Sequence, residues 1–288
     1  MPKIQSRYGI GEIYTRNFAE LSAAEIRSLT SPAVGEMQCR FRGDRCNKKG
    51  GVCSLRVYQR SEDIKVEAIG ELVTTCPQRF KEDGTVFKWI GSTLIETEVP
   101  RVIKEVPFLM GQGDEGNDPD AVGQVDMVIV NDGGPVMKWC CVEMQAVYFS
   151  GPGMESDFKI MREWQGLGLP FPSKLRRPDF RSSGPKRLMP QLQIKVPTVS
   201  RWGRKMAVVV DLPFWNSLAP MSEVQHVSNC DVAWFVVTYV ADGTRFRLQP
   251  HALHLTTLDR AVEGLTGGKP VSMEEFEQRI REKMKRAS

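Results

Sequence analysis

The stretch VDMVIVNDGGPVMKWCCVEMQAVY, residues 125–148, decides the fold of this chain. Residues 125–130 are apolar and rich in β-branched side chains, which is typical of a buried strand. Residues 131–135, Asn-Asp-Gly-Gly-Pro, have the composition of a turn. A second strand is expected over residues 138–148. The stretch therefore predicts an antiparallel hairpin.

The pairing of this hairpin brings two acidic residues together. Cross-strand partners in an antiparallel hairpin have position numbers with a constant sum, and a turn centred on Gly134 and Pro135 sets that sum to 269. Asp126 and Glu143 have this sum, so their Cβ atoms are expected about 5 Å apart. Gln145 lies two residues beyond Glu143 and therefore projects from the same face of its strand.

Two neighbouring carboxylates on one sheet face indicate a metal site. They repel each other unless a cation neutralises them, and Mg²⁺ is suited to do so because it prefers oxygen ligands. A metal held by such a pair can activate water and stabilise charge on a phosphate. The alternative is that both side chains simply face solvent, as most charged strand residues do.

The basic residues of the chain are concentrated in residues 174–205. The whole chain has 288 residues and a formal net charge of +4. This segment holds ten basic residues and one acid, Asp179, which gives +9 and leaves −5 for the rest of the chain. Such a local excess indicates a polyanionic partner, although a solvated charged surface is the alternative. No amphipathic helical period accompanies the charge, which argues against a membrane-surface helix.

Nucleic acid fits the chemistry of this basic segment. Lys and Arg neutralise phosphates, and Arg also reads guanine in the major groove. Gln191 and Gln193 either read bases or line a strand. The dense Pro and Gly content predicts mostly extended chain and loop. The residues expected to contact the nucleic acid are Lys174, Arg176, Arg177, Arg181, Lys186, Arg187, Gln191, Gln193, Arg201, Arg204 and Lys205.

Four of the seven cysteines lie in a polar region rich in Gly and Arg, at Cys39, Cys46, Cys53 and Cys76. Four thiolates in such a region fit a tetrahedral site, and an all-sulfur site favours zinc or iron. A site with every position filled by protein is structural rather than catalytic. The alternative is a set of scattered, buried free cysteines. The other three cysteines, Cys140, Cys141 and Cys230, are expected inside strands and are interpreted as packing residues.

Further helices and strands are expected around the hairpin. Ser and Glu three residues apart form two capping boxes, which predict helix starts. The mixture of elements predicts an α/β fold whose mixed central sheet is flanked by helices. The expected elements are buried strands over residues 206–211 and 231–240, and helices after Ser22, over residues 86–95 and 155–165, and after Ser272.

The sequence also bears on the location of the protein. No run of about 18 uncharged apolar residues is present, so no transmembrane helix is expected. Residues 1–11 lack the apolar core of a signal peptide. We therefore expect the protein to be cytoplasmic, and the cytoplasm is a compartment in which disulfides are disfavoured.

Several short motifs occur one after another along the chain. They are Cys39, Cys46 and Cys53, then Thr75-Cys-Pro-Gln-Arg-Phe80, Gly123-Gln-Val-Asp126, Val142-Glu-Met-Gln145 and Arg177-Pro-Asp-Phe-Arg-Ser-Ser-Gly-Pro-Lys-Arg187. In this combination, over roughly residues 39–215, the chain resembles the NotI-type restriction endonucleases.

The resemblance implies a fold and an assembly. It implies a restriction-endonuclease-like PD-(D/E)XK core with DNA-binding loops over residues 86–288, after an N-terminal region over residues 1–85 with a small four-cysteine metal module. It also implies a homodimer that cuts GC-rich palindromic double-stranded DNA with Mg²⁺, and iron at the four cysteines.

The resemblance further implies roles for single residues. Asp126 and Glu143 would be the Mg²⁺ ligands, and Gln145 would stand in the place of the usual lysine. Glu105 would be the upstream acid that completes the site. Residues 114–120 look like an insertion between Glu105 and Asp126, so the alternative upstream acids are Glu98 and Glu96.

These observations predict a type II restriction endonuclease that hydrolyses phosphodiester bonds in double-stranded DNA at a specific site. Two other functions remain as alternatives. One is a non-catalytic, sequence-specific DNA-binding protein with a structural four-cysteine metal. The other is a structure-specific repair nuclease on the same core.

Overall fold

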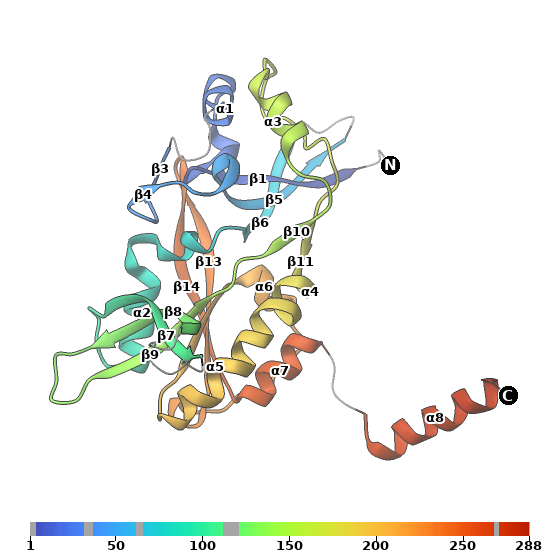
Figure 1. Cartoon of the computed structure of the whole chain (residues 1–288). Helices are drawn as coiled ribbons and strands as arrows, with labels where there is room; N and C mark the ends of the chain where they lie inside the picture. The colour runs from blue at the N-terminus through green and yellow to red at the C-terminus, as the bar shows by residue number, and fades with distance from the viewer. Residues whose placement is uncertain (1–3, 32–36, 62–65, 112–120, 268–270, 288) are drawn as a thin grey trace.

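A mixed six-stranded sheet forms the centre of the molecule (Figure 1). The computed structural model describes residues 4–31, 37–61, 66–111, 121–267 and 271–287. β12 runs parallel to both of its neighbours, and the other pairs are antiparallel, so the predicted mixed sheet is confirmed. The strand order is β14 (Arg245–Thr256), β13 (Val232–Asp242), β12 (Met206–Asp211), β9 (Lys138–Met144), β8 (Ala121–Asn131) and β7 (Arg101–Met110).

The predicted hairpin is present as β8 and β9. Its pairs run from Met127 with Val142 to Asn131 with Lys138, and each pair has position numbers that sum to 269, as predicted. The second strand ends earlier than expected, at Met144. The chain then leaves the sheet, and β10 (Tyr148–Ser150) pairs with β11 (Arg177–Asp179) instead.

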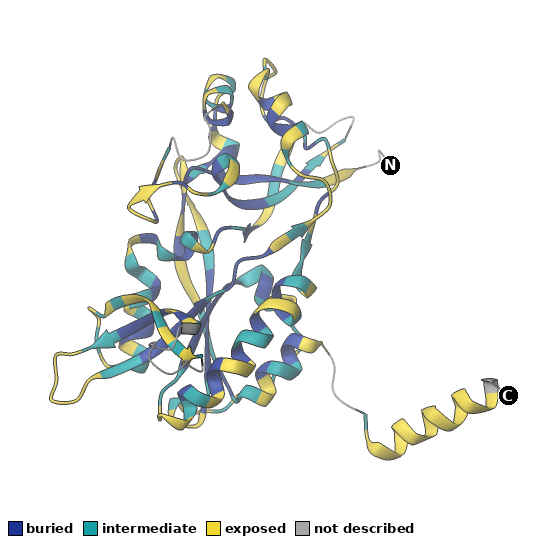
Figure 2. Cartoon of the chain, viewed as in Figure 1, coloured by how far each residue is buried: buried dark blue, intermediate teal, exposed yellow. Residues whose placement is uncertain are grey.

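Helices cover both faces of the central sheet, because its buried strands alternate between two apolar faces (Figure 2). Val208 and Trp234 pack on the face covered by α5 (Met189–Arg201) and α7 (Leu258–Thr266). Val209 and Phe235 pack on the opposite face, against α2 (Thr85–Leu94) and the preceding turn η3 (Pro77–Gly84). Flanking by helices is therefore confirmed. Two shorter helices, α6 (Leu212–Asn216) and η5 (Val227–Asn229), lie beside β12 and before β13.

The basic segment differs from its prediction, because most of it is helical rather than extended. It contains α4 (Phe180–Ser183), the π-helical turn η4 (Gly184–Leu188) and α5. The physical reason is apolar spacing: Leu188, Leu192, Val196 and Val199 recur every three or four residues and are buried against the sheet. Pro190 lies in the first turn of α5, where a missing N–H costs nothing, and Pro197 is tolerated inside the helix.

The N-terminal part forms a second, smaller core. Its sheet has four strands, of which β1 and β5 have nine residues each and β6 has eight. The predicted capping box at Ser22 is present at the start of α1. α3, which is three residues shorter than the expected 155–165, contributes Phe158 and Met161 to this core. The elements are β2 (Arg16–Asn17), β1 (Gln5–Ile13), β5 (Val52–Arg60), β6 (Glu67–Thr74), η1 (Phe18–Glu20), α1 (Ala23–Thr30), β3 (Gln38–Cys39), β4 (Asp44–Arg45), η2 (Lys49–Gly51) and α3 (Glu155–Arg162).

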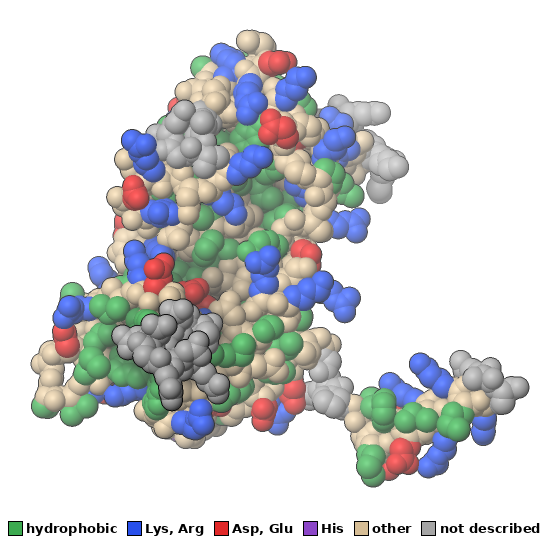
Figure 3. All heavy atoms as spheres, in the orientation of Figure 1, with side chains coloured by type: hydrophobic (Ala, Val, Ile, Leu, Met, Phe, Trp, Pro, Cys, Tyr) green, Lys and Arg blue, Asp and Glu red, His purple; other side chains and the backbone are tan. Residues whose placement is uncertain are grey.

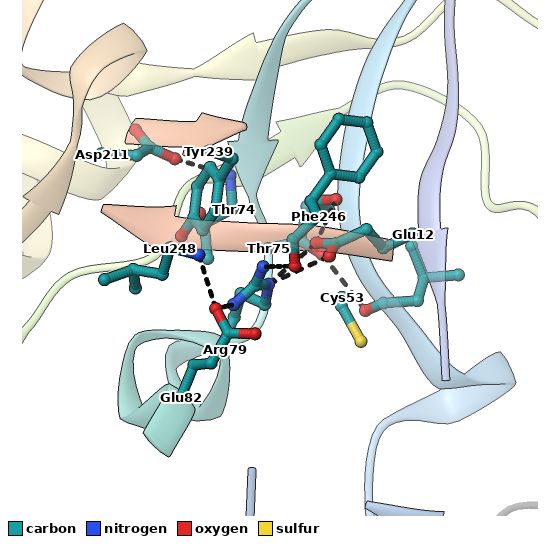
Figure 4. A network of polar contacts seen from close by, with 12 residues as sticks. Glu12, Cys53, Thr74, Thr75, Arg79, Glu82, Asp211, Tyr239, Phe246 and Leu248 are labelled. Atoms are coloured by element: carbon teal, nitrogen blue, oxygen red, sulfur yellow. Dashed lines mark hydrogen bonds and ion pairs between the residues drawn. The ribbon is translucent and has the colours of Figure 1, made fainter. Parts of the chain in front are cut away.

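A buried arginine joins the N-terminal core to the central sheet (Figure 4). Arg79 Nε donates to the two carboxylate oxygens of Glu12 in β1 at 3.1 and 3.0 Å. Its Nη1 donates to Glu82 Oε2 at 2.9 Å, and its Nη2 donates to the carbonyl of Phe246 in β14 at 3.0 Å. Each of the three guanidinium nitrogens of Arg79 therefore has an acceptor, and a buried charge needs such partners.

Asp211 holds a second junction between the two parts. Its carboxylate accepts the N–H of Thr74, at the end of β6, at 2.6 Å, and the N–H of Phe214 at 2.9 Å, which caps α6. Burial raises the pKa of Asp211 to about 6. The bond to Thr74 fixes the start of the segment that leads to Cys76 and the candidate site.

The predicted C-terminal helix is present as α8 (Met273–Ala287), with Ser272 Oγ accepting the N–H of Glu275 at 3.2 Å. Figure 1 shows α8 standing apart from the rest of the molecule. Of the helices in the described ranges, none is long and apolar enough to cross a membrane. The insertion expected over residues 114–120 lies outside the described residues.

Candidate active site

Three carboxylates occupy corresponding positions on three adjacent strands. The pairs Lys104 with Met127 and Val106 with Val125 place Glu105 of β7 opposite Asp126 of β8. The pair Met127 with Val142 places Asp126 opposite Glu143 of β9 in the same way. The register of the sheet therefore aligns Glu105, Asp126 and Glu143 in one row across the strands.

Two adjoining cavities meet at Asp126. The smaller cavity, of about 300 Å³, is lined by Asp126, Glu143 and Gln145. The larger, of about 520 Å³, is lined by Glu105 and again by Asp126. The structure therefore brings together the four residues that the sequence singled out for catalysis. Among described residues, no three His, Cys, Asp or Glu side chains are arranged as a complete metal cage. Mg²⁺ does not require one, since it is usually bound by one or two carboxylates together with water and phosphate.

Glu143 is a buried carboxylate with a cationic partner. Lys195 of α5 is also buried, and its Nζ donates to Glu143 Oε1 and to Gln191 Oε1, the latter at 2.7 Å. Burial raises the pKa of Glu143, the Lys195 ammonium acts against that rise, and the carboxylate of Asp126 adds to it. Lys195 therefore helps to keep Glu143 ionised.

Lys195 is the functional residue that sequence reasoning missed. The segment was predicted to be loop, and a loop gives no reason to direct Lys195 towards the carboxylates. The available signal was helical spacing: Gln191 and Lys195 are four residues apart, beside the buried positions 188, 192, 196 and 199.

Gln145 and Glu105, the other two candidate catalytic residues, differ in burial. Gln145 is largely buried, and its Nε2 donates to the carbonyl of Ala146 at 2.5 Å. Glu105 is exposed and has a φ of +54°, an uncommon backbone conformation for a residue with a side chain. Of the three candidate upstream acids, Glu105 lines a cavity with Asp126, whereas Glu96 pairs with Lys138 and Glu98 precedes β7.

A comparison with protein families identifies the family of the chain. The family model described as Restriction endonuclease NotI matches residues 26–248, which is most of the chain. The chain belongs to the NotI restriction endonuclease family. It is therefore a restriction endonuclease, a hydrolase that acts on DNA. The matched range includes the three carboxylates, Lys195 and the four N-terminal cysteines. No curated protein matched the chain.

Basic side chains surround both cavities of this NotI-family endonuclease. Lys48 and Arg187 line the smaller cavity. Arg42, Lys81 and Lys104 line the larger one. Burial lowers the pKa of Lys81, and the nearby charges of Lys104 and Arg42 lower it further. Except for Arg187, these residues lie outside the basic segment, so the sequence offered no charge cluster that would have identified them.

The structure divides the eleven predicted DNA-contacting residues of the NotI-family chain into separate groups. Those on the β11–η4 side are exposed and lie in the part of the chain that reaches the smaller cavity, where Arg187 also lies over the ring of Tyr148 at 3.7 Å. This group is Lys174, Arg177, Arg181, Lys186 and Arg187.

A second group lies at or just beyond the opposite end of α5, about 20 Å away by helix geometry. Arg201 donates to Thr198 Oγ1 at 3.0 Å, and Arg204 donates to the carbonyl of Met137 at 3.1 Å. Lys205 donates to the carbonyls of Ser228 and Cys230. The two groups therefore lie at opposite ends of α5.

The remaining predicted contacts differ in exposure. Arg176 is buried, pairs with Asp157 at 2.5 Å, and donates to the carbonyls of Pro152 and Gly153. Gln191 is bonded to Lys195, as described above, whereas Gln193 is exposed on α5. Arg176 and Gln191 therefore have protein partners, and Gln193 faces solvent.

The four N-terminal cysteines are all buried and share one neighbourhood. Burial raises the pKa of Cys76, and the nearby Cys39 and Cys46 raise it further. Cys76 in turn contributes to the raised pKa of Cys53, after burial and Glu12. Cysteine sulfur is the donor type that zinc and iron favour, but within the described residues the four side chains are not arranged around a common centre. The other cysteines, Cys140, Cys141 and Cys230, are buried as well, although Cys230 precedes its strand.

Proposed function

We propose that this protein is a type II restriction endonuclease that hydrolyses phosphodiester bonds of double-stranded DNA with Mg²⁺. In this proposal it acts as a homodimer at a palindromic, GC-rich site. The observation that carries the proposal is the row of Glu105, Asp126 and Glu143 across three strands, with basic side chains on both cavities. A two-fold symmetric protein matches a palindromic site.

The residues of the site would have different roles in hydrolysis. A bound Mg²⁺ would lower the pKa of a water molecule and stabilise charge on the phosphate. Asp126 and Glu143 would hold the ion through their carboxylates. Lys195 keeps Glu143 ionised and fixes its direction. Gln145 is neutral and can orient a water or bond a phosphate oxygen, but it cannot act as a strong base.

Basic residues on the two cavities give a route for DNA. Lys48 and Arg187 on the smaller cavity, and Arg42, Lys81 and Lys104 on the larger, can neutralise phosphates on either side of the carboxylates. The exposed residues Arg177, Arg181 and Lys186 extend this surface from the smaller cavity.

The test compares plasmid cleavage by the wild-type chain and by Glu143→Gln in Mg²⁺. Wild-type protein should cut at fixed positions, and the variant should lose at least a hundredfold in rate, because it cannot supply the anionic metal ligand. Glu96→Gln is the matched control, since Glu96 is an exposed glutamate that pairs with Lys138 outside both cavities.

The outcomes separate this function from the alternatives. Equal activity of Glu143→Gln contradicts the assigned site. Salt-sensitive binding without cleavage in any divalent ion favours a non-catalytic DNA-binding protein. Cuts at junctions or lesions regardless of sequence favour a repair nuclease. Sequencing the cut ends identifies the recognition site.

We also propose a structural metal, iron or zinc, at Cys39, Cys46, Cys53 and Cys76. Its support is the donor set: four buried thiols in one neighbourhood. Elemental analysis of purified protein should find one iron or zinc per chain, and Cys76→Ser should lower that content and the stability of the N-terminal part, because binding energy there is folding energy. Cys140→Ser is the control. A metal-free, fully folded wild-type protein contradicts this proposal.

A further inference from the structure

Helix α8 is exposed along its described length and lies beyond residues 26–248, the range that the family model matches. Figure 1 shows it projecting from the body at the C-terminal end of the chain. A helix of 15 residues is only marginally stable in water on its own. Its exposure therefore raises the question of what covers it.

One face of α8 is apolar. Met273, Phe276 and Ile280 are 70%, 58% and 44% exposed, and Met284 continues the row at 66%. Their spacing of three, four and four residues places them in a single stripe along the helix. Figure 3 shows this stripe as a line of hydrophobic side chains along α8. A narrow stripe of this spacing is the pattern of a seam between two helices.

The charges of α8 are divided between its two ends. The first half carries Glu274, Glu275 and Glu277, and the second half carries mostly basic residues. Glu275 and Glu277 pair with Arg279 and Arg281 one turn further on, so part of this charge is neutralised within the helix. Such segregation complements the dipole of a single helix. It also makes the helix complementary to a reversed copy of itself, whereas a parallel copy would set like charges against each other. The basic residues are Arg279 just before the midpoint and Arg281, Lys283 and Lys285 beyond it.

We propose that α8 joins two copies of this chain by pairing with the α8 of the second copy in antiparallel orientation. The stripe has nearly the same spacing when reversed, so Met273 of one copy would lie opposite Met284 of the other, and Phe276 opposite Ile280. The interface is isologous, as a two-fold axis requires. The inference rests on the homodimer of the proposed function and names the element that forms it.

The size of the helix sets the strength of the contact. A helix of 15 residues is about 22 Å long. A stable, specific interface buries roughly 1,600 Å². The α8 pair supplies part of that area, so the dimer should dissociate on dilution.

Analytical ultracentrifugation of the full chain over a range of concentrations tests the stripe. The wild-type protein should form a reversible dimer, and Phe276→Gln with Ile280→Gln should shift the midpoint of dissociation at least tenfold to higher concentration. Gln278→Ala with Glu282→Gln, on the opposite face of α8, is the matched control and should leave it unchanged. Since these side chains are exposed, none of the variants should unfold the body.

Cross-linking tests the orientation. A mixture of Met273→Cys and Met284→Cys proteins should form 273–284 disulfides between copies in excess of 273–273 and 284–284. The native cysteines are buried, which leaves the introduced thiols as the accessible ones. An excess of like-with-like disulfides contradicts the antiparallel arrangement. If the stripe variant dimerises as the wild type does, α8 is not the interface, but the proposed dimeric nuclease still stands. If the wild-type protein is monomeric and active, the proposed dimer is wrong and the proposed nuclease activity stands.

Discussion

At the scale of single residues, the pair of Glu143 and Lys195 decides how the site behaves. A buried carboxylate resists ionisation, and Lys195 opposes that effect through its charge and its bond to Oε1. Breaking a buried ion pair by removing one partner costs about 3–5 kcal/mol, because the other charge is left uncompensated. Lys195 should therefore affect both the stability of the protein and the pH at which the site works.

We expect Lys195→Met to move the acidic limb of the pH–rate profile to higher pH. Without the ammonium, the pKa of Glu143 rises further, so the carboxylate is protonated at a pH where the wild-type residue is ionised. Cleavage should fall about tenfold or more near neutral pH. It should recover in part as the pH is raised. Lys195→Arg, which keeps the charge, should restore part of the wild-type profile.

Lys195→Met should also change how the stability of the protein depends on pH. The pKa of Glu143 is raised in the folded state, so the stability that the group contributes is lost as pH rises through that value. Lys195→Met should therefore lower the melting temperature more at neutral than at mildly acidic pH. Lys138→Met is the control, since Lys138 is a half-buried lysine that pairs with the exposed Glu96. A pH–rate profile of unchanged shape and lower height would show that Lys195 is merely structural.

At the scale of elements, the strands and helix starts that depend on local sequence patterns could be predicted from the sequence. The hairpin register followed from turn chemistry and constant-sum pairing, and the buried strands β12 and β13 followed from their apolar runs. Capping boxes located the starts of α1 and α8. Each of these features is set by neighbours within a few residues or by one turn.

The basic segment could not be predicted in this way. Its Pro and Gly content indicated loop, yet α5 forms because Leu192 and Val196 gain burial against the central sheet, and tertiary packing overrides local preference. Arg176 shows the same limit, since its charge suggested a DNA contact but Asp157, distant in sequence, holds it. Contacts between distant parts of the chain are not visible in local composition.

At the scale of the whole molecule, the charge has two opposed parts near one site. Glu105, Asp126 and Glu143 repel DNA until a cation neutralises them, and the surrounding Lys and Arg side chains attract it. The net charge of the chain, +4, conceals this division. Binding of DNA and binding of a divalent ion should therefore strengthen each other, since coupling between two ligands is reciprocal.

We expect Ca²⁺, at constant ionic strength, to tighten DNA binding by the wild-type chain about tenfold, which is a coupling of about 1.4 kcal/mol. Fluorescence anisotropy with a labelled duplex containing the cut site measures it. Glu143→Gln should bind DNA more tightly without the ion and gain less from it. Arg187→Gln, on the smaller cavity, should reduce the dependence of binding on salt by about one phosphate contact. Arg201→Gln, at the far end of α5, should leave the salt dependence unchanged. Binding that is indifferent to Ca²⁺ in the wild-type chain would refute the coupling, because the three carboxylates would then not lie against the DNA.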